Sequence, residues 1–420
     1  MSGQMGQSQA GQTQTGASPR APRLSQRLGR VQVAASVQMT IKARELRAAG
    51  KDVVTLTTGE PNFDSPPHAI EAAHQAALRG DTKYPPQDGT RELKTAIQRK
   101  FKRDSGIDYA LDEICVGNGG KQCLFNAIMA TVDPGDEVVI PVPSWIAYAQ
   151  MVQLCEGTPV YVNCPQNNGF RPRAEDIDAA ITPNTKWLIL NNPNNPTGAC
   201  CSAEELRAIA DVMLKHPHVW ILSDDMYEHL VFGGFQHATI AQVAPELRDR
   251  TLTVSGVSKT YAMTGWRIGF AGGPRALIKA MVNMQGQATA GISTVGQAAA
   301  AAALDGPQDG VQLQIEAYQR RRDIAVEMLN ACKQITCHKP EGAFYVFPNV
   351  AGCLGRTTAG GRLLQTDEDV CLALLEEKYV ATVHGAAYHM SPYLRISTAT
   401  DDASLVEGCK RIAAFCAELK

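Results

Sequence analysis

The chain has 420 residues, with 40 Lys and Arg against 42 Asp and Glu, so its formal charge is −2. That balance argues against a nucleic-acid or membrane-surface binder, because such proteins carry an excess of cations on one domain or stripe. Hydrophobic residues make up 44%, and no apolar run reaches the roughly 20 residues of a membrane span. The length predicts two or three globular domains, and the balanced charge favours a small substrate.

The beginning of the chain is predicted to be a disordered tail over residues 1–25. Gln, Gly, Ser and Thr dominate its first eighteen positions, and this composition cannot bury a core. Several arginines and no acidic residue precede Glu45, as in organellar transit peptides. Because the segment lacks both an apolar signal region and clear amphipathic patterning, we favour a plain tail on a cytoplasmic protein.

The twelve cysteines are predicted to be reduced thiols packed in the interior. They are too sparse for a disulfide scaffold, and they form neither a Cys-x-x-Cys pair nor zinc-finger spacing with a histidine. His216 and His218 flank a proline and give only a weak metal pattern. We therefore predict no metal site.

The middle of the chain alternates between strand and helix patterns. Helices are expected at 36–49, 66–79 and 90–104, and β-rich runs at 114–117, 137–142, 158–163, 186–190, 218–223, 251–255 and 267–271. Helical stretches such as 120–131 and 202–215 separate most of these runs. Such alternation predicts an α/β fold with a mostly parallel sheet covered by helices on both faces. Its ligands should bind beyond the carboxyl ends of the strands.

The last hundred residues predict a smaller α+β unit. A helix over about 310–333 could link it to the sheet domain, with Arg320, Arg321 and Arg322 on a solvated face. Strands are expected at 343–347, 380–383 and 393–397, and helices near 366–378 and 401–418.

Lys259 leaves the run at 251–255 into a turn of small residues, Ser255 to Gly269. An amine held away from water loses its charge more readily and becomes nucleophilic. An isolated Ser-Lys pair usually lies on the surface, but Arg267 follows eight residues later. A guanidinium is the usual partner of a phosphate that needs a fixed orientation.

Three other motifs follow strand runs, and each has an ordinary explanation when taken alone. The sequence Ser223 to Glu228 could cap the next element, Asn192 to Gly198 could be a turn, and Gly119-Gly120-Lys121 could be a helix start. Together with the Lys259 segment and in this order, they resemble the aspartate aminotransferase family of fold-type I pyridoxal-phosphate enzymes. The resemblance extends from about residue 25 to the C-terminus and is greatest to the bacterial branch that uses aspartate and, in some members, prephenate.

The resemblance implies an arrangement of domains. Residues 61–310 would form the large pyridoxal-phosphate-binding domain. The small domain would be discontinuous, with an N-terminal arm over 26–60 joined to an interdomain helix and C-terminal part over 311–420.

The resemblance also implies how pyridoxal 5′-phosphate is held. Lys259 would form the Schiff base with the cofactor aldehyde and then act as general acid and base. The phosphate would be held by Arg267, by Ser258 and by the helix start at Gly120 and Lys121, where free amides and the helix dipole favour an anion.

The ring of the cofactor would meet a second group of residues. Asp224 would pair with the pyridinium nitrogen, which keeps the ring an electron sink, while Asp225 would be structural. Tyr227 and Asn195 would hydrogen-bond the phenolate oxygen, and a cis peptide before Pro196 is one way to fix the direction of that amide. Trp145 would stack on the ring.

The expected substrates are amino acids and 2-oxo acids. Arg395 matches the family's carboxylate-binding arginine, and Gly59 would approach the same carboxylate through its backbone. Tyr84 matches a tyrosine that reaches the phosphate of the neighbouring subunit's cofactor, which implies a homodimer with shared active sites.

Two alternatives exist for the distal group of the substrate. One branch of the family uses an arginine of the partner chain, but the region 283–293 contains none here. The other branch uses a lysine at the position of Lys121, assisted by a small hydroxyl at the position of Ser36. This match favours acidic substrates such as aspartate and glutamate.

The resulting hypothesis is a ping-pong transaminase that moves an amino group from aspartate to 2-oxoglutarate, with prephenate as an alternative acceptor. Alanine and aromatic donors stay open, and so does a pyridoxal-phosphate lyase that eliminates at the β-carbon on the same fold. A regulator that kept this domain as a ligand sensor is expected to need a DNA-binding module, for which the short tail leaves no room.

Overall fold

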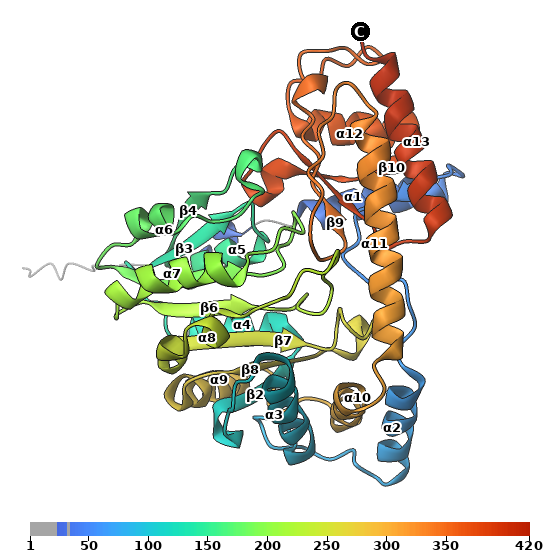
Figure 1. The fold of residues 1–420 in the computed structure, drawn as a ribbon. Coiled ribbons are helices and arrows are strands. Elements are labelled where there is room, and N and C mark those ends of the chain that lie inside the picture. Colours follow the sequence, from blue (N-terminus) through green and yellow to red (C-terminus); the bar gives the residue numbers. More distant parts are fainter. Residues whose placement is uncertain (1–22, 32–33) are drawn as a thin grey trace, which may run out of the picture.

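The computed structural model describes residues 23–31 and 34–420, so the predicted tail lies almost wholly outside the described residues (Figure 1). Within them the largest sheet has seven strands. Their order is β2 (Ile114–Asn118), β8 (Ile268–Gly272), β7 (Thr251–Gly256), β6 (Trp220–Asp224), β5 (Thr185–Asn191), β3 (Glu137–Val142) and β4 (Thr158–Asn163).

The sheet is mostly parallel, as predicted. Strands β4, β3, β5, β6 and β7 all run in one direction, while β8 is antiparallel to both β7 and β2. The central strands are apolar on both faces because both faces are covered. Leu188 and Ile221 point into one core, whereas the adjacent Ile189 and Leu222 point into the other.

Helices cover both faces and one edge of the sheet (Figure 1). One face packs against α4 (Gly120–Met129), α5 (Ala147–Leu154) and α9 (Arg275–Ala288). The other face packs against α6 (Ala174–Ala180), α7 (Ala203–Lys215) and α8 (Ile240–Val243). A third core, near β2 and β8, joins α2 (Pro67–Leu78), α3 (Arg91–Ser105) and α10 (Thr294–Asp305). Among the described residues, no helix has both the length and the apolarity to cross a membrane.

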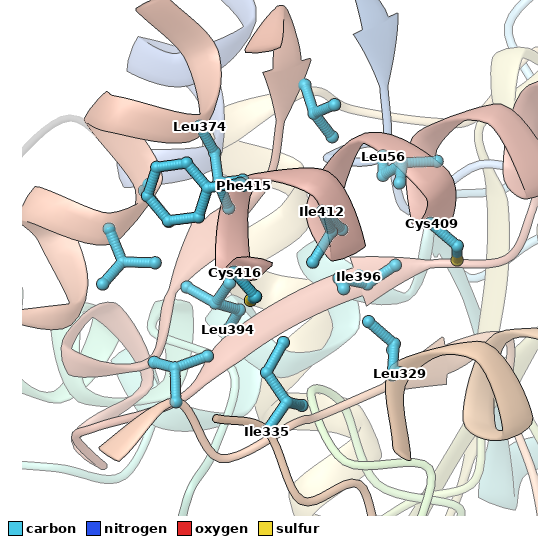
Figure 2. Close-up of a cluster of buried hydrophobic side chains, with 14 of the residues drawn as sticks. Leu56, Leu329, Ile335, Leu374, Leu394, Ile396, Cys409, Ile412, Phe415 and Cys416 are labelled. Atoms are coloured by element: carbon cyan, nitrogen blue, oxygen red, sulfur yellow. The ribbon is translucent and has the colours of Figure 1, made fainter. Parts of the chain in front are cut away.

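A separate core unites the two ends of the described chain. Its elements are α1 (Ala35–Ala48), β1 (Val54–Thr55), α11 (Asp309–Asn330), β9 (Tyr345–Val346), α12 (Asp367–Lys378), β10 (Val380–Ala381), β11 (Val383–His384), β12 (Leu394–Ser397) and α13 (Asp402–Glu418). Strand β1 pairs in parallel with β10, with Val54 opposite Val380. Figure 2 shows Leu56 lying among C-terminal side chains such as Ile412 and Phe415. We call these elements the terminal unit. The twelve cysteines, several of them in this core, are all free and buried, as expected from the sequence.

The prediction of a solvated arginine face on α11 is wrong for two of its three residues. Arg320 is exposed, but Arg321 and Arg322 are buried. The Arg321 guanidinium donates to Asp402 of α13 at 2.7 Å, and the Arg322 guanidinium donates to the carbonyl of Pro340 at 2.9 Å. Arg322 also pairs with the adjacent Asp323 at 2.7 Å, so each of the two buried guanidinium groups has a carboxylate partner.

The buried cation Lys100 ties α3 to the segment after β6. It is only 2% exposed, and its ammonium pairs with Glu228 and lies 3.6 Å from Asp104. Ser255 of β7 donates to the other oxygen of Glu228 at 2.5 Å, and His229 lies 3.2 Å from Asp104. Because these charged groups are shielded from water, each is stabilised mainly by the opposite charges and hydrogen-bond partners beside it.

Replacing Lys100 should therefore destabilise the fold strongly. We expect Lys100→Met to lower the free energy of unfolding by about 3–5 kcal/mol, because it leaves Glu228 buried without its cation. Lys102→Met is the matched control, because Lys102 lies on the same helix but is exposed in its pair with Asp108. Its effect should stay within about 0.5 kcal/mol. Urea denaturation measures both values, and equal losses in the two variants would contradict the account.

Candidate active site

A cavity of about 610 Å³ opens beyond the carboxyl ends of β5, β6 and β7, between the large sheet and the terminal unit. Every site residue predicted from the sequence except Tyr84 lines it. These residues are Ser36, Gly59, Gly120, Lys121, Trp145, Asn195, Asp224, Tyr227, Ser258, Lys259, Arg267 and Arg395. The described lining holds five cationic side chains against two carboxylates, which suits anionic ligands.

Asp224 is the last residue of β6 and is 4% exposed. Its carboxylate accepts hydrogen bonds from the Tyr148 hydroxyl at 2.6 Å and from the amide of Met226 at 3.2 Å. Burial outweighs these donors and raises the pKa of Asp224 to about 6. A cation placed against this carboxylate would lower that pKa again and favour the charged form.

Lys259 extends its amine into the same cavity. Its Nζ donates to the carbonyl oxygen of Gly59 at 2.5 Å. The residue as a whole is half-buried. Burial of the ammonium, together with the charges of Arg395 and Arg267, lowers the pKa of Lys259 to about 8 despite the opposing charge of Glu60. Near neutral pH, such an amine can both hold and release a proton.

The start of α4 and Arg267 together form an anion cradle. The helix begins at Gly120, where the first amides lack intrahelical partners. The preceding Gly119 has a φ of 76°, and a Cβ there would collide with the Arg267 guanidinium. Arg267 is held by bonds to the carbonyls of Thr264 at 2.9 Å and Asn118 at 3.3 Å.

Tyr227 and Asn195 lie on the remaining side. The Tyr227 hydroxyl is 3.0 Å from that of Tyr345. The amide of Asn195 donates to Asn191 Oδ1 at 2.8 Å, and Asn195 Oδ1 accepts from Arg395 at 3.2 Å. These bonds leave the side-chain NH₂ of Asn195 available to a ligand.

The predicted cis peptide before Pro196 is wrong. The cis bond of this turn lies three residues earlier, between Asn192 and Pro193. Asn195 does not need a cis bond, because Asn191 holds its amide and the Gly198 amide closes the turn onto the carbonyl of Asn194 at 2.8 Å.

Arg395 lies on β12 and is buried. It donates to the carbonyl of Thr57, and its guanidinium lies 4.7 Å from the centroid of the Tyr345 ring and 5.2 Å from that of Tyr388. Within the described residues, no carboxylate pairs with it, and its Nε has no partner. A buried guanidinium in this state is ready to bind a carboxylate in bidentate fashion.

Lys121, Trp145 and Ser36 form the outer wall of the cavity. Lys121 is exposed, with its ammonium 4.7 Å from the centroid of the Trp145 ring. Ser36 belongs to α1, which also contributes Thr40 and Arg44 to the lining.

Tyr84 is not brought into this cavity. It is 96% exposed, so within one chain it has no place in the site.

Tyr148 and Tyr345 line the cavity but were not among the predicted site residues. Tyr148 could have been found, since it follows Trp145 by only three residues, in the first turn of α5, and its ring centroid lies 5.5 Å from that of Trp145. Tyr345 carries no such signal, because it meets Tyr227 only in the folded chain.

The profile of the family described as "Aminotransferase class I and II" matches residues 51–412. The chain belongs to this family.

Individual relatives agree over nearly the whole length. An aspartate aminotransferase of Rhizobium meliloti strain 1021 is 52% identical, covering 94% of this chain and 96% of the relative. An aspartate/prephenate aminotransferase of Cereibacter sphaeroides is 53% identical, covering 94% and 99%. The crystal structure of a Rhizobium meliloti aspartate aminotransferase superposes with a TM-score of 0.93 at 51% identity, covering 95% and 100%. The Thermus thermophilus aspartate aminotransferase with maleate gives 0.88 at 39%, covering 94% and 100%.

This aminotransferase depends on pyridoxal phosphate, as its family does, and its cavity fits that cofactor. The desolvated carboxylate of Asp224 suits a protonated ring nitrogen, and the cradle at Gly120 and Arg267 suits a phosphate. The amine of Lys259, with its lowered pKa, suits attack on an aldehyde.

The pH dependence of stability should reveal the burial of Asp224. Its pKa is near 3.8 in an unfolded chain and about 6 when folded, so its contribution to stability is complete below about pH 4 and is lost as the pH rises through 6. At about 1.4 kcal/mol per unit, the loss is roughly 3 kcal/mol. In the protein freed of pyridoxal phosphate, Asp224→Asn should remove this loss.

Urea denaturation at successive pH values tests the prediction. The stability of Asp224→Asn relative to the wild type should rise between pH 4 and 7. Asp133→Asn, at an exposed acid, is the control and should follow the wild-type curve. A constant difference between wild type and Asp224→Asn would contradict the burial argument.

Proposed function

We propose that this aminotransferase moves an amino group, by a ping-pong mechanism, from aspartate to 2-oxoglutarate or to prephenate. The observation that carries the proposal is a pair of cations in one cavity, of which one is buried and the other lies at the outer wall. Arg395 is buried without a carboxylate partner among the described residues, and Lys121 stands at the outer wall. Two such cations suit a substrate with two carboxylates. The names of the relatives and the maleate of the Thermus thermophilus structure agree with this choice.

When bound, pyridoxal phosphate supplies an electron sink for negative charge at the amino-acid α-carbon. Asp224 would keep a proton on the ring nitrogen, with Tyr148 fixing the direction of the carboxylate. The Tyr227 hydroxyl and the side-chain NH₂ of Asn195 would donate to the phenolate oxygen, and Trp145 would cover the ring face.

At the other end of the cofactor, Arg267 and Ser258 would hold the phosphate with the first amides of α4, at Gly120 and Lys121. These contacts are charge-assisted and come from rigid elements, so they would fix the ring against the catalytic amine.

Lys259 would carry the proton between two carbon atoms of the reacting group. A pKa of about 8 allows it to accept a proton from the α-carbon and to return it elsewhere near neutral pH. Its present partner, the Gly59 carbonyl, holds the amine inside the cavity.

Substrate position would be set by three residues besides Lys121. Arg395 would hold the α-carboxylate in bidentate fashion, and the backbone of Gly59 would approach the same group. Ser36 of α1 would assist Lys121 at the distal carboxylate, with both groups on the outer wall.

We extend the proposal to domains, assembly and location. Residues 26–60 and 311–420 would form the small domain, which closes over the large domain at 61–310 when substrate binds. Tyr84, exposed in the single chain, would reach the phosphate in a partner's site, so the enzyme would be a homodimer with shared active sites. We place it in the cytoplasm.

The proposed reaction predicts glutamate as a product. With aspartate and 2-oxoglutarate, the loaded enzyme should form glutamate and oxaloacetate in equal amounts. Lys259→Ala should lose at least a thousandfold in rate and should show no absorbance band that borohydride fixes to the chain, because it lacks the amine. Product chromatography and mass spectrometry of the reduced protein measure these outcomes. Pyruvate and ammonia without glutamate would instead indicate a β-eliminating lyase.

If Lys121 binds the distal carboxylate, replacing it should weaken the binding of acidic substrates only. Lys121→Met should raise the KM for aspartate and 2-oxoglutarate about tenfold, equivalent to about 1.4 kcal/mol, and leave the KM for alanine nearly unchanged. Lys102→Met, at an exposed lysine of α3, is the control. Steady-state kinetics with both donors decide the matter. An equal loss for alanine and aspartate would show that Lys121 does not bind the distal carboxylate.

A further inference from the structure

Tyr345 is a buried tyrosine that reaches the proposed site from the terminal unit. It lies on β9, is 2% exposed and lines the cavity. Its hydroxyl is 3.0 Å from that of Tyr227, which follows β6 of the large sheet. This hydrogen bond therefore joins the two halves of the cavity.

The proposed role of Tyr227 fixes the direction of that bond. Each hydroxyl has one proton to donate. If Tyr227 donates its proton to the cofactor, as proposed above, then Tyr345 has to be the donor between the two. Within the described residues, the Tyr345 hydroxyl has no other hydrogen-bond partner, so its proton is available for this purpose.

Gly59 leaves the space that this hydroxyl needs. A Cβ at Gly59 would collide with the Tyr345 oxygen. The same Gly59 accepts a hydrogen bond from Lys259 through its carbonyl. The absence of a side chain there thus serves the hydroxyl pair as well as the approach of a substrate.

The ring of Tyr345 has a separate contact. The Arg395 guanidinium lies 4.7 Å from its centroid, on the neighbouring strand β12, where Ser397 pairs with Tyr345. The ring also packs against Phe344, with centroids 4.9 Å apart. Because a cation above an aromatic face is attracted to it, the ring supports the guanidinium. The hydroxyl and the ring can therefore be tested independently.

We propose that Tyr345 is a positioning residue that acts at two points: its hydroxyl donates to Tyr227 and strengthens the bond that Tyr227 makes to the cofactor's phenolate oxygen, and its ring supports Arg395 for carboxylate binding. Hydrogen bonds in a chain polarise one another, so the first donor makes the second proton a better donor. The inference rests on the proposed role of Tyr227. It links the carboxylate-binding arginine to the cofactor through a single side chain.

The readout is the pH at which the visible absorption of the pyridoxal-phosphate-loaded enzyme changes. The titrating proton is the one on the nitrogen through which Lys259 would join the cofactor, next to the phenolate oxygen. A hydrogen-bond donor that stabilises negative charge on that oxygen weakens its attraction for this proton. The proton is then lost at a lower pH, so the midpoint falls. The charged groups that face Tyr227 are Asp224 and Arg395, with Lys259 across the cavity. All three are unchanged in the variants below, so the shift reports the phenols.

Two phenylalanine variants and their combination test the hydroxyl. Tyr345→Phe should raise the midpoint by about half a unit and Tyr227→Phe by about one unit, consistent with the strength of neutral hydrogen bonds. The double variant should match Tyr227→Phe alone, because Tyr345 acts through Tyr227. Tyr109→Phe, which removes a buried hydroxyl bonded to Thr253 outside the cavity, is the control and should not move the midpoint.

A leucine variant tests the ring. Tyr345→Phe keeps the ring and should leave the KM for aspartate within about twofold, whereas Tyr345→Leu should raise it about fivefold through loss of the contact with Arg395.

Each failure has a different meaning. If Tyr227→Phe leaves the midpoint unchanged, the proposed role of Tyr227 is wrong. If Tyr227→Phe shifts it and Tyr345→Phe does not, or if the two shifts add in the double variant, the inference about the Tyr345 hydroxyl is overturned. Equal KM values for Tyr345→Phe and Tyr345→Leu would overturn the role of the ring.

Discussion

The buried carboxylate of Asp224 is the constraint around which the cavity is built. Strand register places it: Asn191 of β5 lies opposite Asp224, which in turn lies opposite Val254 of β7. The side-chain amide of Asn191 donates to the Asp224 carbonyl at 2.9 Å, and its side-chain oxygen accepts from the amide of Asn195. One asparagine thus fixes both the backbone of the acid and the turn beside it. Burial disfavours the charged form of this carboxylate, and a ligand cation beside it would stabilise that form, so the site favours a ligand with a positively charged ring nitrogen.

The small net charge of the chain is consistent with this arrangement. An enzyme for anionic ligands does not need a basic surface if a few cations are placed where water is scarce, because their fields are stronger there. Arg395 meets this condition because it is buried, whereas Arg267 is exposed and is oriented by its hydrogen bonds. Arg395 is held between aromatic rings, and Arg267 is held by two carbonyls beside a glycine that leaves it room. Neither is neutralised by a carboxylate among the described residues, so the charge of each is directed toward the cavity.

Much of the fold could be predicted from the sequence because its signals are local. Strand runs separated by helical patterns gave the mostly parallel sheet, and the residues after those runs, such as Asp224 and Lys259, line one cavity. The burial of Arg321 was not predictable in the same way, since its partner Asp402 lies 81 residues further along the chain. The position of the cis bond before Pro193 and the meeting of Tyr345 with Tyr227 likewise depend on tertiary contacts. A resemblance matches residues one at a time and does not show which of them touch.

Three hydrogen bonds inside the cavity join segments that are far apart in sequence. Lys259 binds Gly59, Arg395 binds Asn195, and Tyr345 meets Tyr227. In each pair, one residue lies in the large sheet domain and the other lies in the terminal unit or the segment leading from it. A ligand that occupies the cavity would compete for these same groups, so it would replace contacts between the two halves by contacts through itself. Binding and the relative position of the halves would then be coupled because they depend on the same atoms.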